Sequence, residues 1–93
     1  MPRIDSLDID PHILDKIEAK HGVAWGEVEE VCYTRRHVQQ QGRKEILQIF
    51  GQTYAGRYLV VFLAQHAHIW KVVTARDMED EERRWYQERR RQV

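Results

Sequence analysis

Two arginines flank the most apolar part of this 93-residue chain, where they could bind a phosphate group. The runs 56–64 and 69–77 are rich in β-branched and aromatic residues, which is typical of two buried strands joined by a tight turn. If the turn is even-numbered and centred after His66, antiparallel pairing places Arg57 directly opposite Arg76. Two adjacent guanidinium groups suit a phosphate, whose oxygens accept bidentate hydrogen bonds and offset the repulsion between the like charges.

This pairing has two alternatives, both of which keep the arginines apart. Each arginine could stand at the end of its own strand and point separately into water. An odd-numbered turn would place the two side chains on opposite faces of the sheet, because the residues of a strand alternate between faces. His-Ala is also a poor two-residue turn, since neither residue readily adopts a positive φ. The phosphate site therefore depends on the register of this hairpin.

The composition predicts one compact domain that spans residues 1–93 and lies in the cytoplasm. A chain of this length forms a single core. Its longest apolar run, 58–64, is far shorter than the ~20 residues that span a bilayer. The N-terminus also lacks the apolar segment of a secretory signal, so we expect no contact with a membrane.

We expect no metal ion and no cofactor. The single cysteine, Cys32, excludes an internal disulfide and any site with several cysteine ligands. His66 and His68 have no third ligand nearby in the sequence, and the glycine patterns of nucleotide-binding loops are absent from it.

The net charge of zero hides a strong asymmetry along the chain. Residues 1–33 carry three basic and eight acidic side chains, residues 34–76 seven basic and one acidic, and residues 77–93 five basic and six acidic. The basic middle segment coincides with the predicted sheet, which favours an anionic partner. We therefore expect acidic helices and a basic sheet face. The residues expected on that face include Arg35, Arg43, Arg57 and Arg76.

The pattern of apolar residues predicts an α+β fold, in which an antiparallel sheet of about four strands, with a possible short N-terminal strand, is packed by two N-terminal helices and one C-terminal helix. Asp10 and Pro11 begin the first helix, and Gly22 ends it. The second helix is expected over 24–32, and Asp77 is expected to cap the third, with Asp80 completing the capping box. The expected strands are 4–9, 33–38, 45–54, 56–64 and 69–77.

A cluster of basic residues surrounds the hairpin predicted between strands 33–38 and 45–54. Such a cluster is often a solvated loop tip, but here it extends the basic stretch that contains Arg57 and Arg76. The cluster consists of Arg35, Arg36, His37, Arg43 and Lys44.

Several short motifs together resemble the BrnT family of toxins. They are Lys20-His21-Gly22-Val23, Gly51 at the end of QIFG, Gly56-Arg57 before an apolar strand, and Thr74-Ala75-Arg76 before a helix whose charges run from acidic to basic. Each motif is short, but their order and spacing cover nearly the whole chain. Members of this family are ribonuclease toxins of type II toxin–antitoxin systems, with a fold similar to RelE.

The resemblance implies an endoribonuclease that needs no metal ion and is neutralised by a cognate antitoxin, a small DNA-binding protein encoded beside it. It assigns the catalytic site to Lys20, Arg57 and Arg76, with His21 adjoining. It also makes RNA the expected ligand of the basic cluster. The candidate RNA-binding residues are Arg35, Arg36, Arg43 and Lys44.

The chain departs from the family pattern at two positions. Asp77 stands where the family usually has a basic residue, which changes the local charge of the site. Ala24 stands where the family has a serine or threonine cap, which weakens only the second helix.

Metal-free cleavage of RNA needs a base for the 2′-hydroxyl, a cation for the transition state and an acid for the leaving oxygen. Arg57 and Arg76 fit the role of the cation. The candidates for base and acid are His21, His37, His66, His68, Glu45 and Tyr86. Histidine titrates near neutral pH, and His21 is favoured because it adjoins Lys20 in the family motif. The alternative function is a non-catalytic module that binds nucleic acid or a protein through the same basic sheet.

Overall fold

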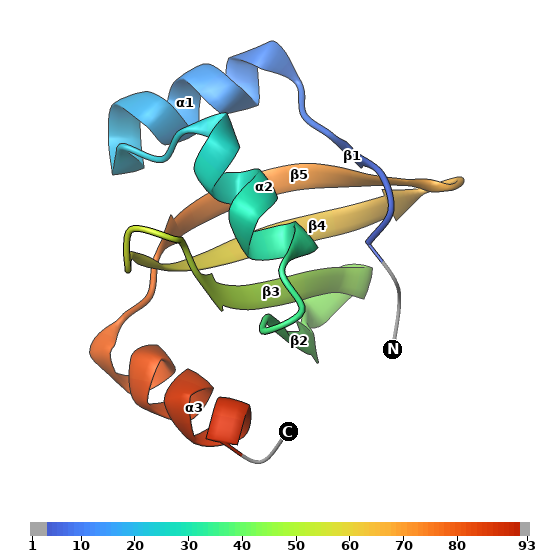
Figure 1. The fold of residues 1–93 in the computed structure, drawn as a ribbon. Helices are drawn as coiled ribbons and strands as arrows, with labels where there is room; N and C mark the ends of the chain where they lie inside the picture. Colours follow the sequence, from blue (N-terminus) through green and yellow to red (C-terminus); the bar gives the residue numbers. More distant parts are fainter. Residues whose placement is uncertain (1–3, 92–93) are drawn as a thin grey trace.

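The computed structural model describes residues 4–91 and shows a five-stranded sheet with helices on both faces (Figure 1). The elements in chain order are β1 (Leu7–Asp8), α1 (Pro11–His21), α2 (Trp25–Tyr33), β2 (Val38–Gln41), the 3₁₀ turn η1 (Arg43–Glu45), β3 (Ile46–Gln52), β4 (Tyr58–His66), β5 (Ile69–Asp77) and α3 (Asp80–Arg91). The strand order is β1-β5-β4-β3-β2, in which β1 is parallel to β5 and the other neighbours are antiparallel. The predicted α+β architecture is confirmed, including the short N-terminal strand at the edge of the sheet.

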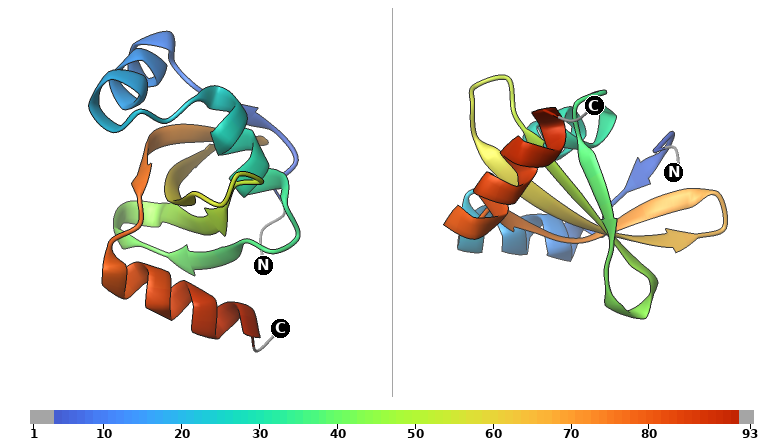
Figure 2. Two further views of the ribbon diagram at one scale, coloured as in Figure 1. Left: turned by 60° about the vertical axis from the view of Figure 1, so that its left-hand side comes forward. Right: turned by 90° about the horizontal axis from the view of Figure 1, so that it is seen from below.

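Hydrophobic cores lie on both faces of the sheet, which explains why β4 is apolar at nearly every position. The larger core packs α1 and α2 against alternate residues of β4, namely Leu59, Val61 and Leu63. The smaller core packs α3 against the other face, where Val60 and Tyr86 are fully buried. Figure 2 shows α3 on the opposite side of the sheet from α1 and α2.

The two ends of α1 agree with the sequence analysis, whereas the start of α3 does not. The carboxylate of Asp10 accepts a hydrogen bond from the amide of His12 at 2.8 Å, and Gly22 ends α1 with a left-handed φ of 63°. Asp77 does not cap α3, because it is the last residue of β5. The carboxylate of Glu82 instead accepts a hydrogen bond from the amide of Glu79, at 2.9 Å.

The boundaries around β2 also differ from the prediction. Tyr33 extends α2 and does not begin a strand. β2 falls on Val38–Gln41, most of which was expected to be a polar loop. β2 pairs with β3 alone and is the last strand in the sheet order, so it forms the edge of the sheet opposite β1.

The turn between β4 and β5 is centred one residue later in the chain than predicted. It consists of Ala67 and His68, and Ala67 adopts a left-handed φ of 56°. His66 therefore pairs with Ile69. The sequence gives no glycine or asparagine to mark this turn, which is why its position was missed.

A β-bulge between Phe62 and Leu63 shifts the register again further along the hairpin. Beyond the bulge, Val60 pairs with Arg76 and Leu59 pairs with Asp77. The predicted pairing of Arg57 with Arg76 is therefore wrong.

Candidate active site around Arg57

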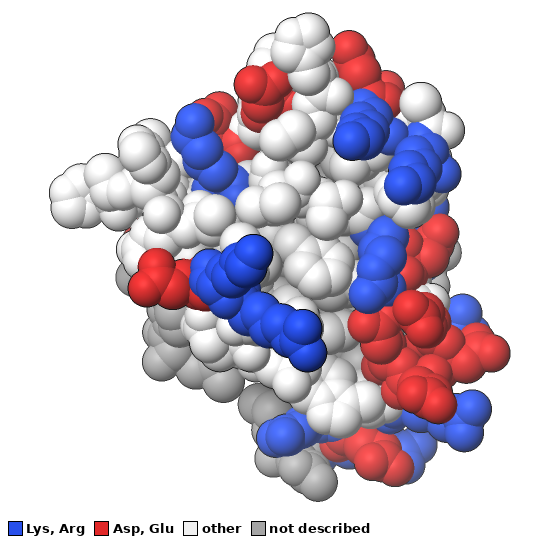
Figure 3. Space-filling model, turned by 180° about the vertical axis from the view of Figure 1, so that it is seen from behind, with Lys and Arg blue, Asp and Glu red and all other residues white. Residues whose placement is uncertain are grey.

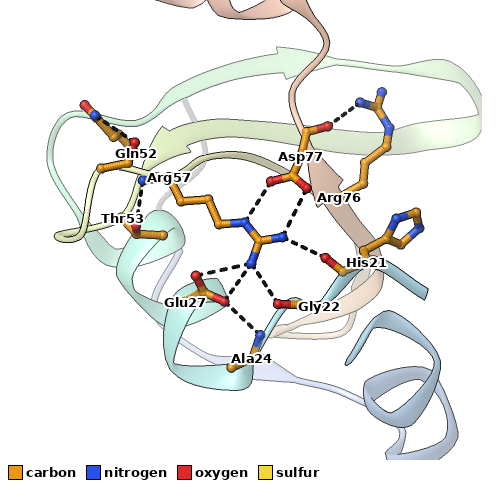
Figure 4. A network of polar contacts seen from close by, with 10 residues as sticks. His21, Gly22, Ala24, Glu27, Gln52, Thr53, Arg57, Arg76 and Asp77 are labelled. Atoms are coloured by element: carbon orange, nitrogen blue, oxygen red, sulfur yellow. Dashed lines mark hydrogen bonds and ion pairs between the residues drawn. The ribbon is translucent and has the colours of Figure 1, made fainter. Parts of the chain in front are cut away.

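The guanidinium group of Arg57 joins α1, α2 and the end of β5 (Figure 4). Two of its nitrogens donate to the two carboxylate oxygens of Asp77, at 2.7 and 3.1 Å. It also donates to the backbone carbonyls of His21 and Gly22, each at 2.7 Å, and to the carboxylate of Glu27 at 3.1 Å. A guanidinium group has five N–H donors, and here each of them has a protein acceptor.

The charges of this cluster stabilise one another. The hydrogen bonds that Arg57 donates to Asp77 raise the pKa of Arg57, and Glu27 adds to this effect. In turn, the hydrogen bonds from Arg57 lower the pKa of Asp77, and the charge of His21 contributes to that shift. Because Arg57 faces two carboxylates, its own positive charge is more than balanced within the cluster.

Two glycine-containing loops place Arg57 and its acceptors. The hydroxyl of Thr53 accepts a hydrogen bond from the amide of Arg57 at 3.0 Å, and the carbonyl of Arg57 accepts one from the amide of Thr53 at 2.8 Å. Gly56 allows this tight loop by adopting a φ of 98°. At the end of α1, the left-handed Gly22 leaves the last carbonyls without helical partners, so they are available to the guanidinium group.

Arg76 lies on the face of the sheet that α3 covers. Its cross-strand partner, Val60, belongs to the core beneath α3. The Arg76 guanidinium group donates to both carboxylate oxygens of Glu82, at 2.7 and 3.0 Å, and lies over the ring of Phe62. It also donates to the backbone carbonyl of Asp77 at 3.0 Å, whereas Arg57 binds the side chain of the same residue (Figure 4). The two arginines therefore meet at Asp77 without facing each other.

Lys20 and His21 form the last turn of α1, beside this cluster. The side chain of Lys20 is exposed and forms no hydrogen bond or ion pair with another residue in 4–91. His21 is partly exposed, and its backbone carbonyl is held by Arg57. The structure thus places His21 at the edge of the Arg57 cluster, and the exposed Lys20 precedes it in the last turn of α1.

The sequence analysis missed the carboxylates that bind the two arginines. They are Glu27, Asp77 and Glu82. Glu27 was detectable in principle, because it occupies the third position of α2 and accepts a hydrogen bond from the amide of Ala24 at 3.1 Å, as capping glutamates do. Asp77 was noted as a change in local charge, but its contact with Arg57 depends on the register.

The basic cluster of the sequence is divided between two loops. Arg35 and Arg36 follow α2, whereas Arg43 and Lys44 lie in η1, and all four are exposed. Figure 3 shows basic side chains in separate groups around an uncharged centre, with an acidic area to one side. The expectation of one basic sheet face is wrong, because Arg57 faces α1 and α2 whereas Arg76 lies on the face of α3.

Of the candidate bases and acids, His21 is the one that contacts the Arg57 cluster. His66 and His68 are exposed at the turn between β4 and β5, at the other end of these strands. His37 is partly buried, and desolvation lowers its pKa. The last two candidates are Glu45, which is exposed in η1, and Tyr86, which belongs to α3 and is buried in the core between that helix and the sheet.

The described part of the chain, residues 4–91, has no group of three or more His, Cys, Asp or Glu side chains placed to hold a metal ion. Within the same residues, every helix is too short or too polar to cross a membrane.

Both the sequence and the fold were compared with those of known proteins. Neither a protein-family model nor a curated protein sequence matches the chain significantly. The comparison of structures matches the 1.1 Å crystal structure of the Brucella abortus ribonuclease toxin BrnT, with a TM-score of 0.67 and 14% sequence identity. The match covers 82% of this chain and 100% of the BrnT chain. The motifs in the sequence and the arrangement of the backbone therefore agree that this protein has a BrnT-like fold.

Proposed function

We propose that the protein is the toxin of a type II toxin–antitoxin pair, and that it cleaves RNA in the cytoplasm without a metal ion. The observation that carries this proposal is the meeting of three separate motifs at Arg57. The segments 20–22, 56–57 and 76–77 are joined there by hydrogen bonds, within a fold that matches the whole of the BrnT chain.

The proposed contacts to the scissile phosphate are Lys20 and Arg76, with His21 as the base that takes the proton of the 2′-hydroxyl while its oxygen bonds to phosphorus. The bond from phosphorus to the 5′-oxygen breaks, and that oxygen leaves with a proton from water. Lys20 suits this role because it has no ion pair within residues 4–91. Arg76 keeps the N–H of Nε and one N–H of Nη2 for a ligand, since its other donors are used by Glu82 and by the carbonyl of Asp77.

Arg57 has a positioning role in this proposal. Its donors are all occupied, and two of them hold the carbonyls at the end of α1, which include that of His21. Arg57 would contact a phosphate directly only if Asp77 or Glu27 released it. We therefore expect loss of Arg57 to act on cleavage through the placement of His21.

The proposed partner that inhibits the enzyme is a cognate antitoxin. Acidic side chains laid across Lys20 and Arg76 would compete with RNA, and such binding weakens as salt screens the charges. Co-expression with the adjacent reading frame should yield a stable complex at low salt. Failure to recover any complex under those conditions would contradict this part of the proposal.

A non-catalytic RNA-binding module is the second candidate function. The observation that favours it is that carboxylates already neutralise Arg57 and Arg76. Such a module would bind RNA but would leave the phosphodiester bond intact.

The experiment that tests the proposal measures RNA cleavage by the purified protein in the presence of EDTA. His21→Asn should lower the cleavage rate by about 100-fold or more, the range expected for loss of a general base. The matched control is His12→Asn, because His12 is an exposed histidine at the start of the same helix.

Lys20→Gln is compared in the same way with Lys16→Gln, which removes the same charge from an exposed position of α1. We expect only the change at Lys20 to slow cleavage. A wild-type protein that binds RNA but neither cleaves it nor arrests growth would refute the enzyme and support the binding module.

A further inference from the structure

A separate cavity of about 350 Å³ lies between α3, the segment that links α2 to β2, and the β3–β4 loop. Figure 2 shows the C-terminal end of α3 beside the segment that follows α2. The residues that matter here are Thr34, Arg36, Gln52, Tyr54, Tyr86 and Arg90. Thr53 and Gly56, whose loop positions Arg57, also line the cavity, but Arg57 itself does not. The size of the cavity is within the range of small-ligand pockets.

This cavity gathers two arginines without a carboxylate. No aspartate or glutamate lines it, and neither Arg36 nor Arg90 forms an ion pair with a residue in 4–91. Arg90 donates instead to the neutral side-chain oxygen of Gln52, at 3.1 Å. Arg57 and Arg76, by contrast, are each paired with carboxylates. The uncompensated positive charge of the cavity therefore suits an anionic ligand.

Tyr86 joins the backbone of Arg36 to the face of α3 that carries Arg90. Its side chain is fully buried, and its hydroxyl donates to the backbone carbonyl of Arg36 at 3.3 Å. Arg90 follows one helical turn later on α3, so it lies on the same face of that helix. Arg36 and Arg90 both line the cavity together with Tyr86. Burial raises the pKa of Tyr86, and the charges of Arg90 and Arg36 oppose that shift.

Tyr54 adds an exposed aromatic ring to the rim of the cavity. The residue is 89% exposed, although its backbone amide is fixed by the carboxylate of Glu30 at 2.8 Å. An aromatic ring next to two guanidinium groups matches the two parts of a nucleotide, because the base can stack on the ring while the phosphate accepts hydrogen bonds from the arginines.

We propose that this cavity binds one nucleotide of single-stranded RNA, with the phosphate on Arg36 and Arg90 and the base on Tyr54. The inference rests on the proposed function for the choice of RNA as ligand and deepens it by specifying a single strand. A base within a duplex is stacked on its neighbours and cannot reach the tyrosine ring.

The test measures the affinity of the protein for a short, fluorescent, single-stranded 2′-O-methyl RNA, which lacks the hydroxyl needed for cleavage. Arg90→Gln should weaken binding about tenfold, as expected for losing hydrogen bonds to a charged group. It should also make the logarithmic salt dependence shallower by ~0.7 for the lost phosphate contact. The matched control is Arg84→Gln, because Arg84 is exposed on the same helix and its replacement removes the same charge.

Tyr54→Ala should weaken binding by about 5- to 150-fold, the range for loss of one stacked base, and Tyr54→Phe should retain the affinity. Tyr33→Ala is the control, since Tyr33 is also exposed. Circular dichroism melting of each variant confirms that it is folded.

The proposal is overturned by equal losses of affinity for Arg90→Gln and Arg84→Gln, or by a Tyr54→Ala variant that binds as the wild type does. It is also overturned if Arg90→Gln weakens binding to an acidic peptide and not to the RNA, since the cavity would then take a protein segment. The assay measures binding and involves no cleavage. A wild-type protein that does not cleave RNA would therefore refute the proposed enzymatic function without affecting the test of the nucleotide-binding cavity.

Discussion

Replacing Arg57 by alanine should lower the free energy of unfolding by about 3 kcal/mol. The carbonyls of His21 and Gly22 would lose donors at 2.7 Å, which contributes roughly 1 kcal/mol each after the usual range for charged hydrogen bonds is reduced for partial exposure. The ion pairs with Glu27 and Asp77 add roughly 0.5 kcal/mol each, because the side chains are 26% and 58% exposed. These contributions add up to the expected loss.

Urea unfolding followed by tryptophan fluorescence measures this loss. A change of this size corresponds to a fall in Tm of roughly 12–24 °C for a domain of this length. Arg57→Lys should recover less than half of the loss, because one ammonium group cannot reach acceptors on α1, α2 and β5 together. Arg43→Ala is the control, since Arg43 is exposed in η1, and it should stay within about 0.5 kcal/mol of the wild type.

The reasoning is refuted if Arg57→Ala unfolds within about 1 kcal/mol of the wild type. That result would mean that water replaces the guanidinium group at the end of α1 at little cost. Arg57 would then be available to RNA, and its proposed positioning role would be lost.

Three further predictions concern the core and the charge of the site. Asp77→Asn should be less stable than the wild type at neutral pH, because Arg57 lowers the pKa of Asp77 in the folded state. The difference should begin to shrink as the pH falls below ~4, the ordinary pKa of aspartate, and should disappear once the pH lies below the lowered pKa of the folded state. Gly51→Ala should cost about 1–3 kcal/mol in urea unfolding, since its Cβ would stand 2.9 Å from the Cγ1 of Val31. Cys32 should resist maleimide at pH 8 until the protein is unfolded, because burial raises its pKa to about 12; rapid labelling of the native protein would contradict this.

The parts of the fold that could be predicted from the sequence are those that local signals determine. Asp10, Pro11 and Gly22 mark the ends of α1 through their own conformational preferences. The apolar run of β4 indicated a central strand with both faces covered, and α3 provides the second cover.

The register of the β4–β5 hairpin could not be predicted in this way. Neither residue type marks the left-handed conformation of Ala67, which is exposed in the turn, or the bulge between Phe62 and Leu63. A shift of one residue moves every following side chain to the other face. For this reason an error at the turn became an error in the partners of Arg57 and Arg76.

The bulge also determines what the change at position 77 means chemically. It places the side chain of Asp77 on the face of Leu59, which is the face where Arg57 lies, and the side chain of Arg76 on the other. A basic residue at 77, as in the family that the sequence resembles, would leave two donors of Arg57 without acceptors and open to a phosphate. With aspartate there, those donors are taken by the protein itself. Lys20 at the end of α1, and Arg36 and Arg90 in the second cavity, have no carboxylate partner within residues 4–91. Our proposals therefore place RNA on these cations, and on Arg76 only through the two donors that Glu82 and the carbonyl of Asp77 leave free.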